Sequence, residues 1–70
     1  IHEVIATTYV LYCAPHKLHS TFDDLYQALG DIDIVVAREL TKVHEEYWKG
    51  TVTQAREYFS NPKGEFVLLF

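Results

Sequence analysis

The sequence lacks the features of a disulfide-stapled, membrane-spanning or nucleic-acid-binding protein. Its 70 residues include one cysteine, Cys13, so an internal disulfide is excluded, which fits a reducing compartment. No apolar run approaches the ~18 residues of a membrane span, and the first residues lack the basic start of a signal peptide. With 6 basic against 10 acidic residues, the net charge of −4 argues against autonomous binding to nucleic acid, which needs clustered Lys and Arg.

Glycine is also scarce, and methionine is absent. The three glycines, Gly30, Gly50 and Gly64, are isolated, and no G-x-G-x-x-G or P-loop motif is present. Nucleotide binding by this chain alone is therefore not predicted. Because the sequence begins without methionine and ends inside an apolar run, we expect a fragment of a longer protein.

What the sequence does contain predicts one small folded domain. The composition is that of a globular protein, with 49% hydrophobic and 23% charged residues. Residues 4–12 are rich in β-branched and aromatic side chains and predict a strand. A helix is predicted over residues 16–29, between Pro15 and Gly30, with Ser20 or Thr21 as possible caps of a shorter one. The apolar stripe of this helix consists of Leu18, Phe22, Leu25, Tyr26 and Leu29.

The second half of the chain repeats the alternation of strand and helix. Residues 34–38 predict a strand buried on both faces, and residues 47–49 a short extended piece. Thr51 and Gln54 have capping-box spacing, so a helix is predicted over residues 52–59, followed by a strand over 65–70. The order β-α-β-(β)-α-β predicts an α/β fold (α+β is possible) with about two helices on a small mixed sheet, and matches a split βαβ unit. The strand order is not determined by the sequence.

The most distinctive stretch is residues 35–46, where the apolar strand turns abruptly into charge. Sites of α/β proteins lie beyond the carboxyl ends of buried strands, so we expect these charges to mark a functional site. The alternative is a solvated loop whose charges pair with one another and contribute little.

Two other combinations of residues predict chemistry less well. Cys13, His16 and His19 have the spacing C-x-x-H-x-x-H, with His44 further on, but zinc sites pair two ligand clusters. Ordinary capping or surface histidines explain the pattern better, and we expect no metal. A nucleophile formed by Cys13 and His16 lacks an evident third group to orient the histidine, and a small residue closing a strand is the simpler interpretation.

Three stretches together resemble one protein family. They are residues 12–18 (YCAPHKL), residues 36–42 (VARELTK) with the following HEE and GT, and residues 62–68 (PKGEFVL). In this order and spacing they resemble the C-terminal domain of the ribosomal RNA small subunit methyltransferase I family, within the tetrapyrrole (corrin/porphyrin) methylase fold. The resemblance spans nearly the whole chain, and the block A-R-E-L-T-K-x-H-E-E is its most specific part.

The resemblance implies a transferase that uses S-adenosylmethionine to methylate the 2′-hydroxyl of a cytidine ribose in small-subunit ribosomal RNA. It implies that the cofactor lies in a cleft between this domain and an N-terminal domain that this sequence does not contain. The 70 residues alone are therefore expected to be inactive. A cytoplasmic homodimer that needs no metal is also implied.

Carried over residue by residue, the resemblance assigns cofactor binding to the end of the first strand and to the charged stretch. The cofactor-binding positions are Cys13, Ala14, Pro15, Ala37, Leu40 and Thr41. Cys13 departs from the family pattern, in which a carboxylate is common, so a backbone contact is retained there and a side-chain role is not.

The charged positions expected to contact the substrate are Arg38, Glu39, Lys42, His44 and Glu45. A ribose hydroxyl is weakly acidic, so a carboxylate or imidazole would help remove its proton, and a cation would hold a phosphate. A purely structural network of these charges is the alternative, and no catalytic residue is assigned.

Two further functions remain open from the sequence. One is a tetrapyrrole methyltransferase with a small-molecule substrate, which the acidic charge favours and the A-R-E-L-T-K block disfavours. The other is a non-catalytic interaction domain that pairs through an exposed sheet edge and through Trp48, which we expect in an exposed loop beside Lys49.

Overall fold

The computed structural model describes residues 9–41 and 44–70, except for the side chains of residues 40, 41 and 44. The elements follow the predicted order β-α-β-(β)-α-β, with a short 3-10 turn before the first helix. None of the helices in these ranges has the length and apolar character of a membrane span. The elements are β1 (Val10–Cys13), the 3-10 turn (Pro15–Lys17), α1 (Leu18–Leu29), β2 (Asp33–Thr41), β3 (His44–Thr51), α2 (Val52–Tyr58) and β4 (Glu65–Leu69).

The four strands form one sheet in the order β1-β4-β2-β3, and each neighbouring pair is antiparallel. Because β1 and β2 both run antiparallel to β4, they are parallel to each other with β4 between them. This arrangement confirms the predicted split βαβ unit and the predicted α/β class. The sequence did not determine the strand order, since the pairing of β4 with both strands depends on contacts distant along the chain.

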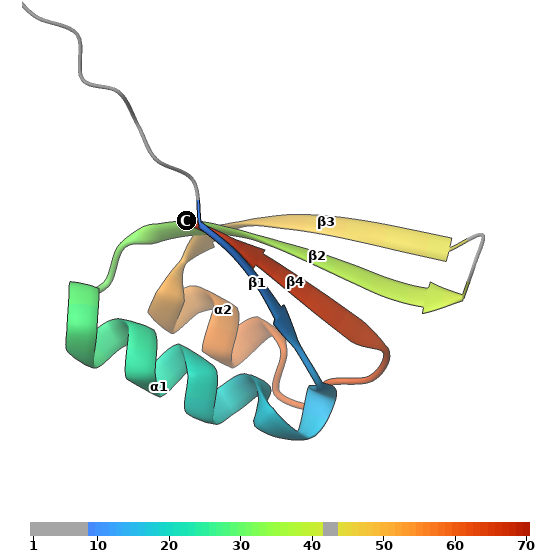
Figure 1. Cartoon of the computed structure of the whole chain (residues 1–70), viewed down its shortest axis with the longest axis horizontal. Coiled ribbons are helices and arrows are strands. Elements are labelled where there is room, and N and C mark those ends of the chain that lie inside the picture. The colour runs from blue at the N-terminus through green and yellow to red at the C-terminus, as the bar shows by residue number, and fades with distance from the viewer. Residues whose placement is uncertain (1–8, 42–43) are drawn as a thin grey trace, which may run out of the picture.

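Both helices lie on the same side of the sheet (Figure 1). Side chains alternate between the two faces of a strand, so Ile34 and Val36 of β2 and Phe66 and Leu68 of β4 point toward the helices and are buried. The intervening residues of the strands point to the opposite side, which we call the open face. The rest of the core consists of Leu18, Phe22, Leu25, Val52, Ala55 and Phe59.

Helix α1 begins later and buries less than its sequence predicts. Pro15 starts the 3-10 turn, and α1 follows directly, so the shorter helix capped by Ser20 or Thr21 does not form; both hydroxyls instead donate to the Lys17 carbonyl. Leu29 is 51% exposed and Tyr26 50% exposed, so their predicted places in the buried stripe are wrong. Both lie toward the end of α1, beyond the buried residues Leu18, Phe22 and Leu25.

Helix α2 begins at the predicted capping box. The Thr51 hydroxyl accepts a hydrogen bond from the Gln54 amide at 3.3 Å, and the Gln54 side chain accepts one from the Thr51 amide at 3.0 Å. Asp31, which follows α1, accepts hydrogen bonds from the Thr53 amide and hydroxyl, each at 2.8 Å. The end of one helix is thereby tied to the beginning of the other.

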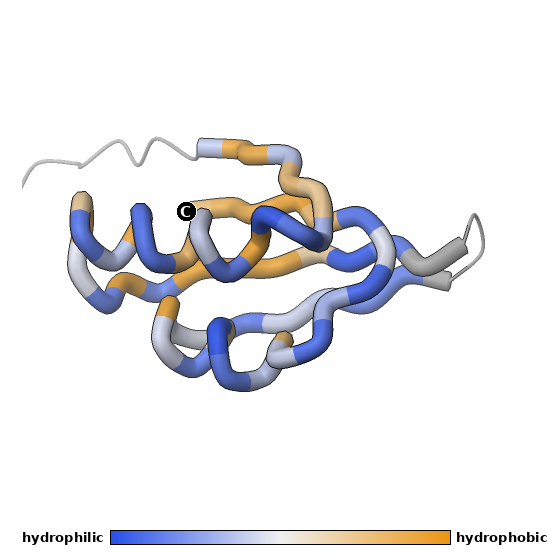
Figure 2. Tube along the Cα trace, turned by 90° about the horizontal axis from the view of Figure 1, so that it is seen from below, coloured by the Kyte–Doolittle hydropathy of each residue, from blue (hydrophilic) through white to orange (hydrophobic). Residues whose placement is uncertain are grey.

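The charged stretch after residue 38 is part of a β-hairpin, which corrects the predicted loop. Strand β2 continues to Thr41, and β3 is eight residues long, where the sequence predicted a short piece at 47–49. In Figure 2 the coloured part of the hairpin becomes hydrophilic away from the helices, whereas β4 and the near half of β2 are hydrophobic. The first strand is described only from Val10, and the earlier part of its predicted range, residues 4–8, lies outside the described residues.

Candidate functional site

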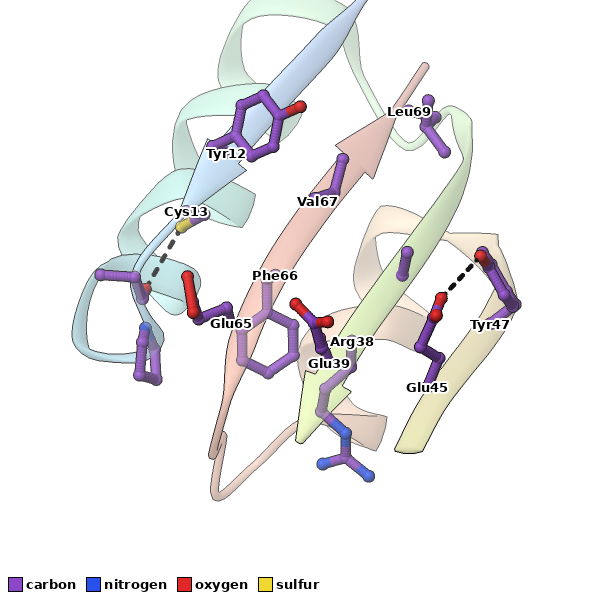
Figure 3. A pocket seen from close by; sticks show the side chains of 13 residues that line it. Tyr12, Cys13, Arg38, Glu39, Glu45, Tyr47, Glu65, Phe66, Val67 and Leu69 are labelled. Atoms are coloured by element: carbon purple, nitrogen blue, oxygen red, sulfur yellow. Dashed lines mark hydrogen bonds between the residues drawn. The ribbon is translucent and has the colours of Figure 1, made fainter. Parts of the chain in front are cut away.

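A concavity lies on the open face of the sheet and extends from the end of β1 across to β3. It is an open pocket of about 610 Å³ (Figure 3). Four of the six residues predicted to bind a cofactor line it, together with three of the five predicted to bind substrate. The predicted residues that line it are Cys13, Ala14, Pro15, Ala37, Arg38, Glu39 and Glu45, and the others are Tyr12, Tyr47, Glu65, Phe66, Val67 and Leu69.

One wall of the pocket is the turn that connects β1 to the helical layer. Ala14 is extended, with φ −72° and ψ 151°, and its carbonyl accepts a hydrogen bond from the Lys17 amide at 3.0 Å. Pro15 begins the 3-10 turn, where its missing N–H leaves no donor unsatisfied. The Cys13 thiol lies 3.4 Å from the Thr21 hydroxyl, so it contacts α1. The turn is therefore held by contacts on the helix side.

The strand register places the open-face residues in rows that cross the sheet. Tyr12 lies opposite Val67, Val67 opposite Ala37, and Ala37 opposite Tyr47. We call these four residues the tyrosine row. Ala37, the smallest of them, lies between the two larger neighbours Val67 and Tyr47. The pocket therefore has an apolar floor flanked by aromatic rings.

The next row toward the hairpin end is entirely acidic. Glu39 is the partner of Glu45 on β3 and of Glu65 on β4, and these three residues form the glutamate row. Figure 3 shows the three side chains side by side across β4, β2 and β3. Glu45 accepts a hydrogen bond from the Tyr47 hydroxyl at 3.0 Å, which raises the pKa of Tyr47 because the ionised phenol would lose that bond.

The predicted charged residues are divided between the two faces of the hairpin. Glu39 and Glu45 lie on the open face, whereas Arg38 belongs to the alternate set that points toward the helices. Arg38 forms an ion pair with its cross-strand partner Glu46, and its guanidinium lies 5.6 Å from the centre of the Phe59 ring. Arg38 still lines the pocket, but its positive charge is paired with Glu46 of the same domain.

Glu46 also connects the hairpin to α2. It accepts a hydrogen bond from the Tyr58 hydroxyl at 2.8 Å, which raises the pKa of Tyr58. Trp48 stacks on Tyr58 with ring centres 5.5 Å apart and meets Phe59 edge-on. Trp48 is half-buried and packs against the core, so the prediction of an exposed loop tryptophan is wrong. The exposed aromatic side chains of the sheet are instead Tyr12 and Tyr47.

Several predicted residues are placed only in part. Leu40, Thr41 and His44 belong to the hairpin strands, and their side chains are not described. Lys42 lies outside the described residues. Glu65, which the sequence did not single out as a site residue, enters the site because β4 pairs with β2. Its sequence signals are its place in the stretch PKGEFVL and its position just after Gly64, at the start of a strand.

Cys13, His16 and His19 do not form a group of metal ligands. His19 contacts the Phe59 carbonyl through Nε2 at 2.7 Å, which joins α1 to the residue after α2. His16 is exposed on the 3-10 turn. Among residues 9–41 and 44–70, no group of three or more His, Cys, Asp or Glu side chains is arranged to hold a metal ion.

The chain is similar to proteins named ribosomal RNA small subunit methyltransferase I. The protein of that name from Synechocystis sp. is 51% identical over 65 residues, which are 89% of this chain and 23% of that protein. Those from Bacillus subtilis and Thermotoga maritima are 39% and 36% identical over 64 and 62 residues. These matches cover 89% and 86% of this chain and 22% and 28% of the two proteins.

No family model matches the chain. The chain spans about a quarter of the length of the curated relatives named above. The resemblance seen in the sequence is confirmed, since this small α/β domain is similar along most of its length to one part of proteins named ribosomal RNA small subunit methyltransferase I.

Proposed function

We propose that this chain is the C-terminal domain of an S-adenosylmethionine-dependent methyltransferase that methylates the 2′-hydroxyl of a cytidine in small-subunit ribosomal RNA. The observation that carries the proposal is the pocket, which is lined both by the turn at Cys13, Ala14 and Pro15 and by Ala37. These segments are more than twenty residues apart in sequence, and the family resemblance assigns cofactor binding to both. Proteins named ribosomal RNA methyltransferases match the chain across both segments.

The pocket has the chemistry that a nucleoside donor needs. Its floor is apolar and includes the small side chain of Ala37, which suits burial of a flat ring. When bound, the cofactor supplies a methyl group that is already electrophilic, so the protein has to align the donor and acceptor atoms and accept a proton. Leu40 and Thr41 complete the proposed cofactor-binding set.

Glu39, Glu45 and Glu65 are the described residues best placed to accept a proton near the pocket, because all three lie on the open face and line the pocket. We also propose that the substrate contacts Arg38, Glu39, Lys42, His44 and Glu45. The proposed partner is ribosomal RNA, and the proposed location is the cytoplasm. The proposed state of the protein is a homodimer that needs no metal. The electrostatic attraction to RNA has to come from outside this acidic domain.

The cofactor part of the proposal is tested by filling the pocket. In the full-length protein, Ala37→Leu places a larger side chain at the pocket centre. Val35→Leu is the matched control, since residue 35 lies on the same strand and face but does not line this pocket. Equilibrium dialysis with labelled S-adenosylmethionine should show weakened binding for Ala37→Leu and unchanged binding for Val35→Leu. Equal binding by both variants would contradict the placement of the cofactor.

The reaction itself is tested with labelled S-adenosylmethionine and assembled small ribosomal subunits. Digestion of the RNA should give label on the ribose of cytidine. Label on a tetrapyrrole instead would replace the RNA substrate with a small molecule, and the absence of transfer to either would favour an interaction domain. The 70-residue chain alone should transfer no methyl group.

A further inference from the structure

We infer that strand β3 carries the binding site for the base of the target nucleotide. The ring of Tyr47 stacks on the base, and the carboxylate of Glu45 accepts a hydrogen bond from an amino group on the edge of that base. The inference rests on the proposed function, which supplies an RNA substrate. It deepens that proposal by assigning Glu45 to recognition of the base, which leaves Glu39 and Glu65 to accept the proton of the ribose hydroxyl.

The ring of Tyr47 is left uncovered by its neighbours. Its partner on β2 is Ala37, whose methyl group covers little of a phenol ring. Tyr47 lines the pocket and is 70% exposed, whereas the adjacent Trp48 stacks on Tyr58. Among residues 9–41 and 44–70, no aromatic ring packs against Tyr47. An uncovered aromatic ring at the wall of a pocket is a surface on which unpaired RNA bases stack.

The hydroxyl of Tyr47 holds the carboxylate of Glu45 in place. It donates a hydrogen bond to Glu45 Oε1 at 3.0 Å, which Figure 3 shows. This bond raises the pKa of Tyr47, so the phenol stays protonated and remains the donor at neutral pH. The other carboxylate oxygen of Glu45 has no hydrogen-bond partner within the described part of the chain. Glu45 is therefore ready to accept a second hydrogen bond beside the uncovered ring.

A carboxylate at this place distinguishes bases by their amino groups. An ionised carboxylate accepts hydrogen bonds and donates none. It pairs with the exocyclic amine of cytosine, which is a recurrent mode of base recognition. Uracil presents a carbonyl oxygen at the same position, so two acceptors would face each other unpaired. Glu45 therefore selects cytosine against uracil, the pyrimidine that matches it in size.

The pocket has a separate end for each of the two reactants. The turn at residues 13–15, which is assigned to the cofactor, follows β1, and Tyr47 lies on β3. Strands β4 and β2 lie between them, so three spacings between neighbouring strands separate the two ends by roughly 14 Å. The apolar floor is continuous between these ends. The methyl donor at the turn and the base on β3 can therefore be bound at the same time.

The choice between cytidine and uridine tests the inference. The full-length protein is given small ribosomal subunits reconstituted with RNA that carries either nucleotide at the methylated position, and kcat/KM is measured for both. We expect the wild type to prefer cytidine and Glu45→Gln to lose about tenfold or more of that preference, because an amide accepts from cytosine and also donates to uracil. The matched control, Glu65→Gln, makes the same change in the glutamate row and should keep the preference, whatever its turnover.

The stacking role of Tyr47 is tested through KM. Tyr47→Ala removes the ring and should raise KM for both substrates by about tenfold or more, since stacking on an aromatic side chain contributes strongly to binding of single-stranded RNA. Tyr47→Phe keeps the ring and loses the hydroxyl, so it should keep the wild-type KM for cytidine while its preference for cytidine falls. An unchanged KM in Tyr47→Ala would contradict the stacking.

The outcomes keep this inference apart from the proposed reaction. If Glu45→Gln slows transfer to both substrates by the same factor, Glu45 serves the proton transfer or the fold, and the inference is overturned. It is also overturned if Glu65→Gln relaxes the preference as much as Glu45→Gln does. Absence of transfer to RNA by the wild type overturns the proposed function and this inference with it. Because the preference is a ratio measured on one enzyme sample, partial unfolding of a variant does not change it.

Discussion

Arg38 and Glu46 face each other across the β2–β3 ladder and form an ion pair on the helix-covered side of the sheet. Their side chains are 22% and 29% exposed. Phe59 lies against the guanidinium, and Tyr58 donates a hydrogen bond to the carboxylate. The pair therefore joins the hairpin that carries Glu39 and Glu45 to helix α2, and it holds the open-face glutamates in register.

Removal of Arg38 should destabilise the domain. Arg38→Ala leaves the half-buried Glu46 carboxylate without its cation and removes the contact with Phe59. Loss of a partly buried ion pair of this kind costs about 1–2 kcal/mol. Urea unfolding of the variant measures this change. Arg56→Ala, which breaks the exposed pair with Asp23, is the comparison and should cost clearly less, because solvent screens that pair. A larger loss for Arg56→Ala would contradict the structural role of Arg38.

A side chain at position 50 should displace Trp48. A Cβ atom built on Gly50 would lie 2.5 Å from the Trp48 ring and 2.8 Å from the Gln54 side-chain oxygen. Gly50→Ala should therefore push the indole aside, disturb the cap of α2 and cost about 1–3 kcal/mol, as overpacking does. The emission of the single tryptophan reports the movement.

Gly30 provides the control for this experiment. Its φ of 83° favours glycine, and nothing lies within 4 Å of a Cβ built there. Gly30→Ala should destabilise the domain through backbone strain while leaving the tryptophan emission unchanged. An unchanged spectrum for Gly50→Ala would show that Trp48 does not occupy the space beside Gly50.

Acid should weaken the link between the two helices. The hydrogen bonds that Thr53 donates to Asp31 lower the pKa of Asp31 in the folded state. A lowered folded-state pKa gives stability that is present above the unfolded pKa of ~3.9 and is lost as the pH falls through the folded value. The difference in unfolding free energy between wild type and Asp31→Asn should be constant near neutral pH and shrink below ~4. A difference that grows on acidification would contradict this assignment.

The sequence determined the local elements well because their signals are local. Thr51 and Gln54 mark the start of α2 within four residues, and Gly30 marks the end of α1. The hairpin was missed because its charged residues are typical of a loop, and only pairing with β4 and β3 makes residues 38–41 and 44–46 strand. Glu65 was missed for the same reason, since a cross-strand neighbour has no signature in its own segment.

The sequence also did not predict which side chains lie on which face of the sheet. Arg38, Glu39 and Glu45 form one charged group in the sequence, but the alternation of the strand sends Arg38 to the helices and both glutamates to the open face. Trp48 and Tyr47 are adjacent, and the same alternation buries part of the first and exposes the second. The two-residue period of a strand thus decides which side chains reach the candidate site, and the register is fixed only in the folded sheet.

Neutralising the middle glutamate should stabilise the isolated domain. Glu39 has Glu45 on one side and Glu65 on the other, so Glu39→Gln removes two like-charge contacts at once. The expected gain in unfolding free energy is about 0.5 kcal/mol at low salt, and it should shrink at high salt because the repulsion is between exposed groups. Glu57→Gln, on the exposed side of α2, is the control and should change little. Urea unfolding at two salt concentrations measures the change in stability. A loss of stability in Glu39→Gln would show that the carboxylate is stabilised by contacts within the domain.

Folding alone favours an uncharged residue at position 39. If Glu39→Gln stabilises the domain but weakens the activity of the full-length enzyme, the carboxylate of Glu39 serves function at the expense of stability.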